Sequence, residues 1–373
     1  MAQNSDKIGK VALMHDYLNQ CGGAERVLEV LAEIFPEAPI YTLFYDEKKT
    51  RGYFANRVKK TSFLDFSIVR NNHRAFIPLL PLASNNLKLG PHYDLVVSSS
   101  AGYAKGFNFK NAFHICYCHT PLRYAWEKNY LRGLDLFRLP ALKTLAKPVR
   151  AALRHWDKKA SRQVDIFIAN SYFTAKKINN FYNREAEVIY PPIDLGKFYP
   201  EPKSKTGDYF LMVGRLLHYK RFDLGIKAFN RLGFPLKIVG EGPELSKLKS
   251  LVKSPLIEFL PFVESLDELR KIYSQARALI FPQVEDFGLV AAEAQACGLP
   301  IIGYNAGGLK EIVKEGKTGL FFNEQTPESL IKAVYFFEKI DFSRPKIVQN
   351  AQRFSKENFK SKFQEIINKI KLN

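Results

Sequence analysis

Residues 282–322 read PQVEDFGLVAAEAQACGLPIIGYNAGGLKEIVKEGKTGLFF, and this stretch decides the fold of the second half of the chain. It contains two short apolar runs, Pro300–Tyr304 and Gly319–Phe322, each preceded by a segment with helical spacing, and a third run, Ala278–Phe281, comes just before it. Short β-prone runs that alternate with helices of about ten residues are typical of a parallel, doubly wound sheet. We therefore predict an α/β domain that binds its ligands at the carboxyl ends of the strands.

The same alternation extends over the rest of the chain. In the second half, three more runs are predicted to be strands: Tyr209–Gly214, Leu236–Gly240 and Ile257–Leu260. The first half has a less regular version of the pattern, with predicted strands at Lys10–His15, Ile40–Phe44, Asp94–Ser98, Phe113–Tyr117, Asp165–Ala169 and Glu187–Tyr190. Two doubly wound domains are expected, and their ligand is expected in the cleft where the two face each other.

The segment VIYPPIDLGKFYPEP, residues 188–202, divides the two halves. Its four prolines and its turn residues are typical of a linker between domains. We predict an N-terminal domain over residues 1–195 and a C-terminal domain over residues 196–344. Residues 345–373 have helical apolar spacing without a further strand, which predicts a final helix.

Length and composition exclude several classes of protein. The chain has 373 residues, which suggests two or three domains, and its 46% hydrophobic and 25% charged content excludes a mainly disordered chain. The four cysteines form no CxxC pair, so a zinc site or a disulfide framework is not expected. No signal peptide or membrane-spanning run is recognised, which predicts a cytoplasmic protein whose membrane contact, if any, is peripheral.

The net charge of +19 is the unusual quantity. A strongly basic protein usually binds nucleic acid, an anionic membrane or a phosphorylated ligand. Much of the excess falls in residues 51–74 and 128–177. In the second segment an apolar stripe is bordered by basic side chains, a pattern that suits an anionic membrane surface but also a core-packing helix with a solvated basic face. The stripe is Leu142, Leu145, Val149, Leu153 and Trp156, and the basic residues are Lys143, Lys147, Arg150, Arg154 and Lys158.

Glycines and cations follow several of the predicted strands. Gly22 and Gly23 stand between the first strand and a helix, where they form either an anion-binding turn or simply a tight turn. Arg215 and Lys220, in GRLLHYKR, suit a diphosphate, the alternative being a solvated basic loop. Gly240 stands in VGEGPE at the next strand–helix junction, where a turn is sufficient to explain it.

Two glutamates and a histidine complete the set of candidates. Glu285 is expected on the loop after a strand, and Glu293 about a turn and a half into the following helix. Carboxylates accept hydrogen bonds from sugar hydroxyl pairs, although two solvated acids would have the same spacing. The helix should begin at the run Phe287, Gly288 and Leu289, where free N–H groups can hold hydroxyls. His119 ends a strand before Pro121, and it is either structural or functional.

Together these segments resemble the retaining glycosyltransferases of family four, which have the GT-B fold. The resemblance covers nearly the whole chain, and its most specific part is PxxEDFGLVAAEAxAxGLPIIGxxxGGxxEIV…GxTGLFF in residues 282–322. It implies two Rossmann-like domains that face each other across a cleft, a nucleotide-sugar donor held mainly by the C-terminal domain, and a final helix that crosses back to the N-terminal domain.

The resemblance also implies roles for individual residues. Arg215 and Lys220 match the diphosphate-binding pair, and Glu293 matches the ribose-binding glutamate. Glu285 and His119 match residues beside the donor sugar. The remaining matches are the backbone amides that hold sugar hydroxyls, at Phe287, Gly288 and Leu289, and the phosphate-side glycine loop, at Gly22 and Gly23.

The N-terminal segments HDYLxxxGGAERV, FPEAPIYTLFYD and CHTPLRYAW are similar to bacterial mannosyltransferases that use GDP-mannose to build O-antigen and other surface polysaccharides. This similarity alone implies GDP-mannose, because no residue physically requires guanine or mannose. It also implies a lipid-linked saccharide acceptor, which the N-terminal domain would bind. Arg123, Tyr124 and Trp126 are the acceptor-side candidates, since aromatic rings can stack on a sugar and Arg can reach a phosphate.

The expected chemistry is transfer with retention by attack on the face that the leaving group vacates. No obvious carboxylate pair is available for a covalent route, and the departing diphosphate can take the acceptor's proton. No DxD triplet occurs, so neither a metal nor another cofactor is expected, and Arg215 and Lys220 would neutralise the leaving group. The alternatives are a UDP-sugar transferase, a sucrose-type synthase or phosphorylase, a basic nucleic-acid-binding protein and a non-catalytic scaffold. Nucleic acid is not expected as a partner, because no recognised module is present.

Overall fold

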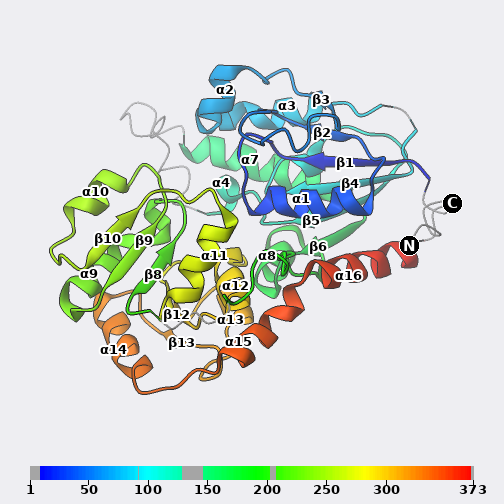
Figure 1. Cartoon of the computed structure of the whole chain (residues 1–373). Coiled ribbons are helices and arrows are strands. Elements are labelled where there is room, and N and C mark those ends of the chain that lie inside the picture. The colour runs from blue at the N-terminus through cyan, green and yellow to red at the C-terminus, as the bar shows by residue number, and fades with distance from the viewer. Residues whose placement is uncertain (1–8, 91, 128–145, 202–206, 371–373) are drawn as a thin grey trace. The chain divides into compact units, whose positions relative to one another are not determined.

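The computed structural model describes residues 9–90, 92–127, 146–201 and 207–370 (Figure 1). The chain forms two compact units. The first contains residues 1–190 together with residues 360–373, and the second contains residues 191–359. The chain therefore leaves the first unit at Tyr190, within the proline-rich segment, and comes back to it near its end.

The first unit is built on a seven-stranded parallel sheet with the strand order β3-β2-β1-β4-β5-β6-β7. Its strands are β1 (Val11–His15), β2 (Ile40–Thr42), β3 (Val58–Thr61), β4 (Leu95–Ser100), β5 (Phe113–Cys118), β6 (Ile166–Ala169) and β7 (Glu187–Val188). Its described helices are α1 (Gly23–Ile34), α2 (Ser67–Asn72), η2 (His73–Leu79), α3 (Leu80–Asn86), η3 (Ala104–Gly106), α4 (Arg123–Trp126), α7 (Ala146–Ala160), η5 (Ser161–Gln163) and α8 (Tyr172–Tyr182).

The second unit is built on a six-stranded parallel sheet with the order β10-β9-β8-β11-β12-β13. Its strands are β8 (Phe210–Val213), β9 (Leu236–Val239), β10 (Ile257–Leu260), β11 (Leu279–Phe281), β12 (Ile301–Tyr304) and β13 (Gly319–Phe322). Its described helices are η6 (His218–Lys220), α9 (Phe222–Leu232), α10 (Leu245–Ser250), α11 (Leu266–Gln275), α12 (Leu289–Ala296), α13 (Leu309–Ile312), α14 (Pro327–Phe337), α15 (Arg344–Ala351) and η7 (Gln352–Phe354).

Each sheet has one point where the strand order reverses. In the first sheet β1 lies between β2 and β4, and in the second β8 lies between β9 and β11. The loops that leave the two strands on either side of such a point run in opposite directions along the sheet, which opens a crevice at the carboxyl ends. The loops after β1, β4, β8 and β11 are therefore the ones on which ligand-binding residues are expected.

Apolar strands account for the two sheets. The central strands β1 and β4 of the first sheet are almost fully buried, as expected for parallel strands covered on both faces. All six strands predicted for the second half are present, with ends shifted by a residue or so, and so are the six predicted for the first half. The prediction missed β3, whose sequence VKKT is polar because this edge strand is only half-buried.

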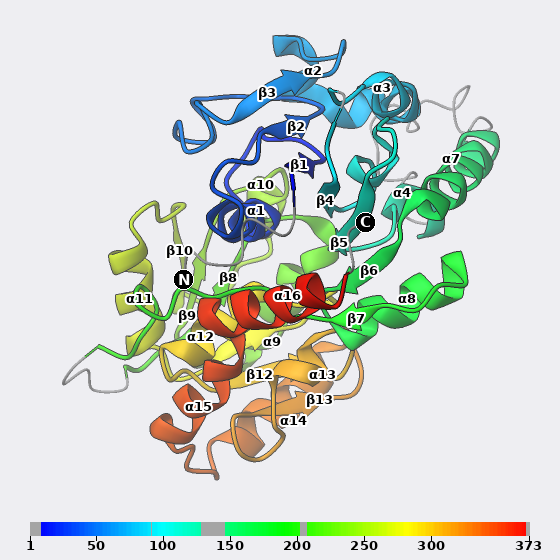
Figure 2. The ribbon, with the colours of Figure 1, turned by 90° about the vertical axis from the view of Figure 1, so that its right-hand side faces the viewer.

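The final segment is two helices and not one. α15 ends at Ala351, the turn η7 follows, and α16 (Lys356–Lys369) begins after Ser355, which forms a bridge with Ile193. Within the first unit, α16 approaches α1 (Figure 2): the Phe363 ring packs on Phe35 at 6.2 Å, and Lys360 lies 2.7 Å from Glu33.

The described part of the apolar stripe, Val149, Leu153 and Trp156, lies on α7 and packs on the core of the first unit, which is the second of the two interpretations that the sequence left open. Leu153 is buried, and Val149 and Trp156 lie against the same core cluster. Pro148 stands in the first turn of α7, where a proline is tolerated. α7 therefore offers solvent its basic side chains but not this stripe, whereas Leu142, Lys143 and Leu145 lie outside the described residues. In the described part of the chain, no helix is long and apolar enough to cross a membrane.

Candidate active site

In the second unit, the candidate cations lie just after β8. Gly214 follows the strand with φ 148°, in the region that favours glycine, and the exposed Arg215 comes next. The chain then turns through η6, which ends at Lys220. Both cations therefore stand on the loop at the reversal of the strand order, at the carboxyl edge of the sheet.

Lys220 forms an ion pair with Glu285, the first glutamate of the long motif. Glu285 lies on the loop after β11, so this pair connects the two loops on either side of the reversal point. The side chains are 17% and 16% exposed, so solvent can still reach them. An ammonium group has three donors, and Lys220 can bind a phosphate oxygen while it keeps Glu285 as a partner.

The Gly-Gly pair of the long motif holds the loop of Glu285 in place. Gly308 donates its N–H to the carbonyl of Glu285 at 2.9 Å. A Cβ at Gly307 would lie 2.5 Å from that carbonyl oxygen, and one at Gly308 would lie 2.4 Å from the carbonyl oxygen of Asp286. Contacts this close exclude any side chain, so these two glycines allow the loops after β11 and β12 to pack directly on each other.

Helix α12 begins at the position that the motif predicts. Gly288 is its N-cap with φ 107°, and Leu289 is its first residue. The Phe287 ring is buried against Phe354. Glu293 lies one turn into the helix with 3% of its surface exposed, and it accepts a hydrogen bond from the Tyr273 hydroxyl at 3.4 Å. The free N–H groups of this helix start stand next to the loop that carries Glu285.

Gly240 has a packing role. A Cβ there would lie 2.1 Å from the carbonyl oxygen of Gly214, and Gly214 donates its N–H to Val239 at 3.0 Å. The loops after β8 and β9 are thus in direct backbone contact, which positions the Arg215 loop. This contact explains Gly240 without a ligand.

In the first unit, the Gly-Gly loop is held by a buried acid. Gly22 is the N-cap of α1, and its N–H donates to Glu25 at 2.9 Å. The other oxygen of Glu25 lies 3.8 Å from Nε2 of His15, the last residue of β1. Gly22 has φ −131°, and neither it nor Gly23 adopts a positive φ, so a left-handed turn is not the reason for this pair of glycines.

A serine joins this loop to His119. Ser99 Oγ lies 3.1 Å from His15 Nδ1 and 2.8 Å from His119 Nε2. His119 directly follows β5, and its N–H donates to the Ser100 carbonyl at 2.8 Å. Glu25, His15, Ser99 and His119 thus form one polar chain along the carboxyl edge of the first sheet, so the orientation of the His119 ring depends on residues of β1 and β4.

Asp16 organises the loop that follows β4. Its carboxylate accepts hydrogen bonds from the backbone N–H groups of Ala101 (2.7 Å), Tyr103 (3.0 Å) and Ala104 (2.5 Å), and from the Ser100 hydroxyl (3.2 Å). A buried carboxylate with this many donors fixes the loop firmly.

The acceptor-side candidates lie on the short helix α4. Arg123 is half-buried, and Tyr124 packs partly against the core cluster. Trp126 is held from several sides: its indole N–H donates to Asp157 at 2.7 Å, its ring stacks on Phe181 at 4.4 Å, and the Arg154 guanidinium lies 5.4 Å away. These contacts explain Trp126 as a packing residue of the first unit.

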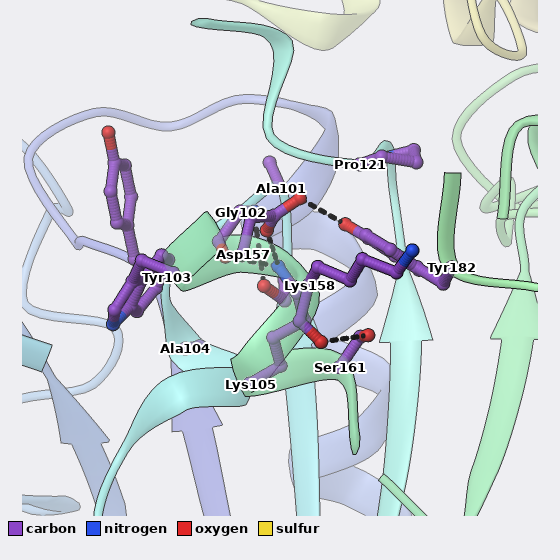
Figure 3. A network of polar contacts seen from close by, with 12 residues as sticks. Ala101, Gly102, Tyr103, Ala104, Lys105, Pro121, Asp157, Lys158, Ser161 and Tyr182 are labelled. Carbon is purple, nitrogen blue, oxygen red and sulfur yellow. Dashed lines mark hydrogen bonds and ion pairs between the residues drawn. The ribbon is translucent and has the colours of Figure 1, made fainter. Parts of the chain in front are cut away.

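Asp157 is the centre of a buried network (Figure 3). It pairs with Lys105 at 2.6 Å and accepts the Tyr182 hydroxyl at 2.7 Å, and Lys105 also donates to the Gly102 carbonyl. Burial lowers the pKa of Lys105, but the charge and hydrogen bond of Asp157 outweigh it, so the pKa lies above its usual value. The network ties α7 to the loop that Asp16 organises and, through Trp126, to α4.

Sequence reasoning missed Asp16, His15, Glu25 and Ser99. One signal for them is present in β4, whose sequence LVVSSS ends in three consecutive buried serines. Polar side chains at the carboxyl end of a buried strand require partners. Ser98 contacts His114, Ser99 contacts both His15 and His119, and Ser100 donates its hydroxyl to Asp16.

Within the described residues, no group of three or more His, Cys, Asp and Glu side chains is arranged to hold a metal ion. At the carboxyl edge of the second sheet, Arg215, Lys220, Glu285 and the N–H groups at the start of α12 form a set suited to an anionic, hydroxyl-rich ligand.

Two family models match the chain, and their matches meet at residue 197. Residues 21–197 match Glycosyltransferase Family 4, and residues 197–354 match Glycosyl transferases group 1. Each half of the chain thus matches a glycosyltransferase family model, and the two parallel α/β units have the architecture of the GT-B fold.

Relatives among known proteins agree with this family. An uncharacterized glycosyltransferase of Methanocaldococcus jannaschii is 28% identical over 206 residues, which are 54% of this chain and 58% of that protein. A D-inositol 3-phosphate glycosyltransferase of Nocardioides is 27% identical over 241 residues, covering 55% and 52%. The chain thus spans about half the length of these relatives.

Solved structures cover more of the chain at lower identity. Anabaena HepE in complex with UDP and glucose is 17% identical with a TM-score of 0.65, covering 97% of this chain and all of HepE. The lipopolysaccharide outer core galactosyltransferase WaaB has the same identity and coverage with a TM-score of 0.67. At this identity the likeness shows the fold.

Proposed function

We propose that the protein transfers a hexose from a nucleotide sugar to a saccharide acceptor with retention of anomeric configuration. The pairing of Lys220 with Glu285 carries this proposal, because it joins a cation suited to a diphosphate and an acid suited to sugar hydroxyls at one crevice. Arg215 on the same loop and the start of α12 beside it supply further donors for an anionic ligand.

The proposed mechanism relies on charge stabilisation at the leaving group. Arg215 and Lys220 bind the diphosphate, and the charge that develops on the departing oxygen is stabilised by these cations and by helix N–H groups. The bond from the sugar's anomeric carbon to the diphosphate oxygen breaks. The acceptor oxygen bonds to the same face, and its proton passes to the departing phosphate. No step in this scheme requires a metal.

Mannose from GDP-mannose is the donor we propose, and the resemblance of the N-terminal segments supports it. The acceptor is then a lipid-linked saccharide in surface polysaccharide synthesis, bound by the N-terminal domain with Arg123 and Tyr124 at its site. A UDP-sugar is the second candidate, which the UDP complex of the structurally similar HepE favours.

Thermal denaturation with matched ligands tests the donor. A ligand that binds the folded state at 100 times its Kd stabilises that state by about 2.7 kcal/mol. We expect GDP-mannose to raise the melting temperature of the wild type but not that of Lys220→Ala, and UDP-glucose to have little effect. If only UDP-sugars raise the melting temperature, the donor is a UDP-sugar and not GDP-mannose. If no nucleotide sugar raises it, the proposed function is contradicted.

The stereochemistry of the product tests retention. With the stabilising donor and a simple saccharide acceptor, NMR of the first product should show the anomeric configuration of the donor. The opposite configuration would overturn the proposed same-face attack, whatever the identity of the sugar.

A further inference from the structure

One region of the first unit exposes large apolar side chains. Within residues 59–88, five large apolar side chains are 46–67% exposed: Phe63, Phe66, Ile68, Leu79 and Leu82. Lys59, Lys60, Arg74 and Lys88 are exposed in the same segment. We call these nine residues the apolar–basic surface. In the rest of the described part of the first unit, the large apolar side chains exposed to a similar degree are Tyr53 and Tyr172.

The apolar–basic surface stands on an anchored segment. Leu64, Val69, Ile77 and Leu80 come from between the exposed residues and are buried in the core cluster of the first unit. The segment comprises β3, α2, η2 and α3, and η2 packs on both α2 and α3. The exposed side chains therefore stand on a segment whose buried residues are fixed in the core.

The charge of this segment has one sign where it faces solvent. Residues 59–88 contain a single acidic residue, Asp65, against five Lys and Arg residues. Asp65 is half-buried and pairs with Arg70 at 2.6 Å, which neutralises it. The exposed ionised side chains of the segment are therefore all cationic.

We propose that the apolar–basic surface docks the protein on the headgroup region of an anionic lipid bilayer. Transfer of Phe, Ile and Leu side chains from water to the acyl boundary lowers the free energy of the system, and Lys and Arg are attracted to anionic headgroups. A nucleic acid would use the cations but leave the exposed aliphatic side chains in water, so it fits this surface less well. The proposal does not depend on the sugar donor, since membrane binding needs neither donor nor acceptor.

Helix α7 is the natural comparison, because its sequence pattern suits either a membrane contact or a helix packed on the core. Its exposed basic residues include Lys147 and Lys158, but Leu153 is buried and Val149 and Trp156 pack on the core. α7 can contribute electrostatic attraction but cannot insert these side chains. Binding that requires apolar insertion must therefore depend on the segment 59–88.

Sedimentation with vesicles tests the proposal. The full chain is mixed with vesicles of phosphatidylcholine, alone or with 30% phosphatidylglycerol (about the anionic content that gives a marked negative surface potential). We expect the wild type to bind the anionic vesicles but not those of phosphatidylcholine alone. The double variant Phe66→Ser with Ile68→Ser should bind the anionic vesicles about tenfold or more weakly, and so should the separate double variant Lys59→Glu with Lys60→Glu. Circular dichroism checks that these exposed substitutions leave the fold intact.

Two matched variants make the result specific. Tyr335→Ser with Phe336→Ser removes two apolar side chains of similar exposure from α14 in the second unit, and Lys147→Glu with Lys158→Glu reverses the same number of charges on α7. Neither should reduce binding as much as the changes in the apolar–basic surface. Loss of binding in the α7 variant alone, or no binding of the wild type to anionic vesicles at low salt, overturns the proposal.

A second copy of the chain is the other occupant to be distinguished. Sedimentation velocity of the wild type and of Phe66→Ser with Ile68→Ser measures self-association without lipid. A monomer in both cases agrees with membrane docking. A wild-type dimer that this variant dissociates, together with unchanged vesicle binding, would assign the surface to self-association instead.

Discussion

At the scale of single residues, the candidate site depends on side chains whose partners are far away in sequence. Lys220 pairs with Glu285, and His119 reaches His15 through Ser99. Motif reading selected Lys220, Glu285 and His119, because each follows a predicted strand. It did not select Ser99 or His15, because a serine inside a buried strand and a histidine at its end are also common structural features.

Replacement of Lys220 tests the proposed charge stabilisation. In Lys220→Ala we expect turnover to fall by about 10²–10³, since one preorganised positive charge at the leaving group is lost. Lys220→Arg should keep part of the activity, and Lys227→Ala, an exposed lysine on α9, should keep all of it. Initial rates with and without EDTA complete the test, and strong inhibition by EDTA would contradict a metal-independent reaction.

Ser99 is expected to act as a positioning residue for His119. In Ser99→Ala the ring of His119 loses the hydroxyl that lies 2.8 Å from it, and kcat should fall about 10- to 100-fold with little change in donor affinity. Ser99→Thr keeps the hydroxyl and should restore part of the rate. Ser98→Ala is the control, because Ser98 contacts His114 instead. Equal kcat values for Ser98→Ala and Ser99→Ala would contradict this role.

At the scale of helices and strands, periodicity predicted nearly every element that carries a candidate residue. It missed β3, and for α7 it left open whether the core or a membrane covers the apolar face, because tertiary contacts decide both environments. The strand β3 is polar because it lies at the sheet edge, and α7 is amphipathic because it packs on the core. An amphipathic pattern specifies that an apolar face will be covered, but the pattern is the same whether a protein core or a membrane covers it.

The buried Lys105–Asp157 pair should be the main anchor of α7. In Asp157→Ala the Lys105 charge stays buried without its counterion, so we expect the free energy of unfolding to fall by about 3–5 kcal/mol. Urea denaturation measures this loss. Lys158→Ala, at the neighbouring exposed position of α7, should change stability by less than about 0.5 kcal/mol. Similar losses in both variants would show that the pair does not anchor the helix.

At the scale of the whole molecule, the chain ends in the unit in which it began. Residues 360–373 group with residues 1–190, and Phe363, Ile366 and Ile367 of α16 are buried. Stability of the first unit therefore depends on the last helix of the sequence. The diphosphate that we propose for Arg215 and Lys220 and the anionic bilayer that we propose for the segment 59–88 would account for part of the net charge of +19.

Truncation of Phe363 tests this dependence. Phe363→Ala should lower the free energy of unfolding by about 3–5 kcal/mol, because a fully buried ring that packs on Phe35 is lost. Hydrogen exchange should show the loss of protection in α1 and α16. Phe336→Ala, an exposed ring on α14, should have little effect. Unchanged protection of α1 in Phe363→Ala would contradict the proposed support.

The amino-acid sequence by itself determined the α/β class, the strand positions and the loops that carry Gly22, His119, Arg215, Lys220 and Glu285. These features depend on local periodicity and on residues next to strand ends, which can be read along the chain. The tertiary structure decided which side chains meet: Lys220 with Glu285, Lys105 with Asp157, and Ser99 with two histidines. It also decided which apolar side chains stay exposed, because burial depends on packing between segments distant in sequence.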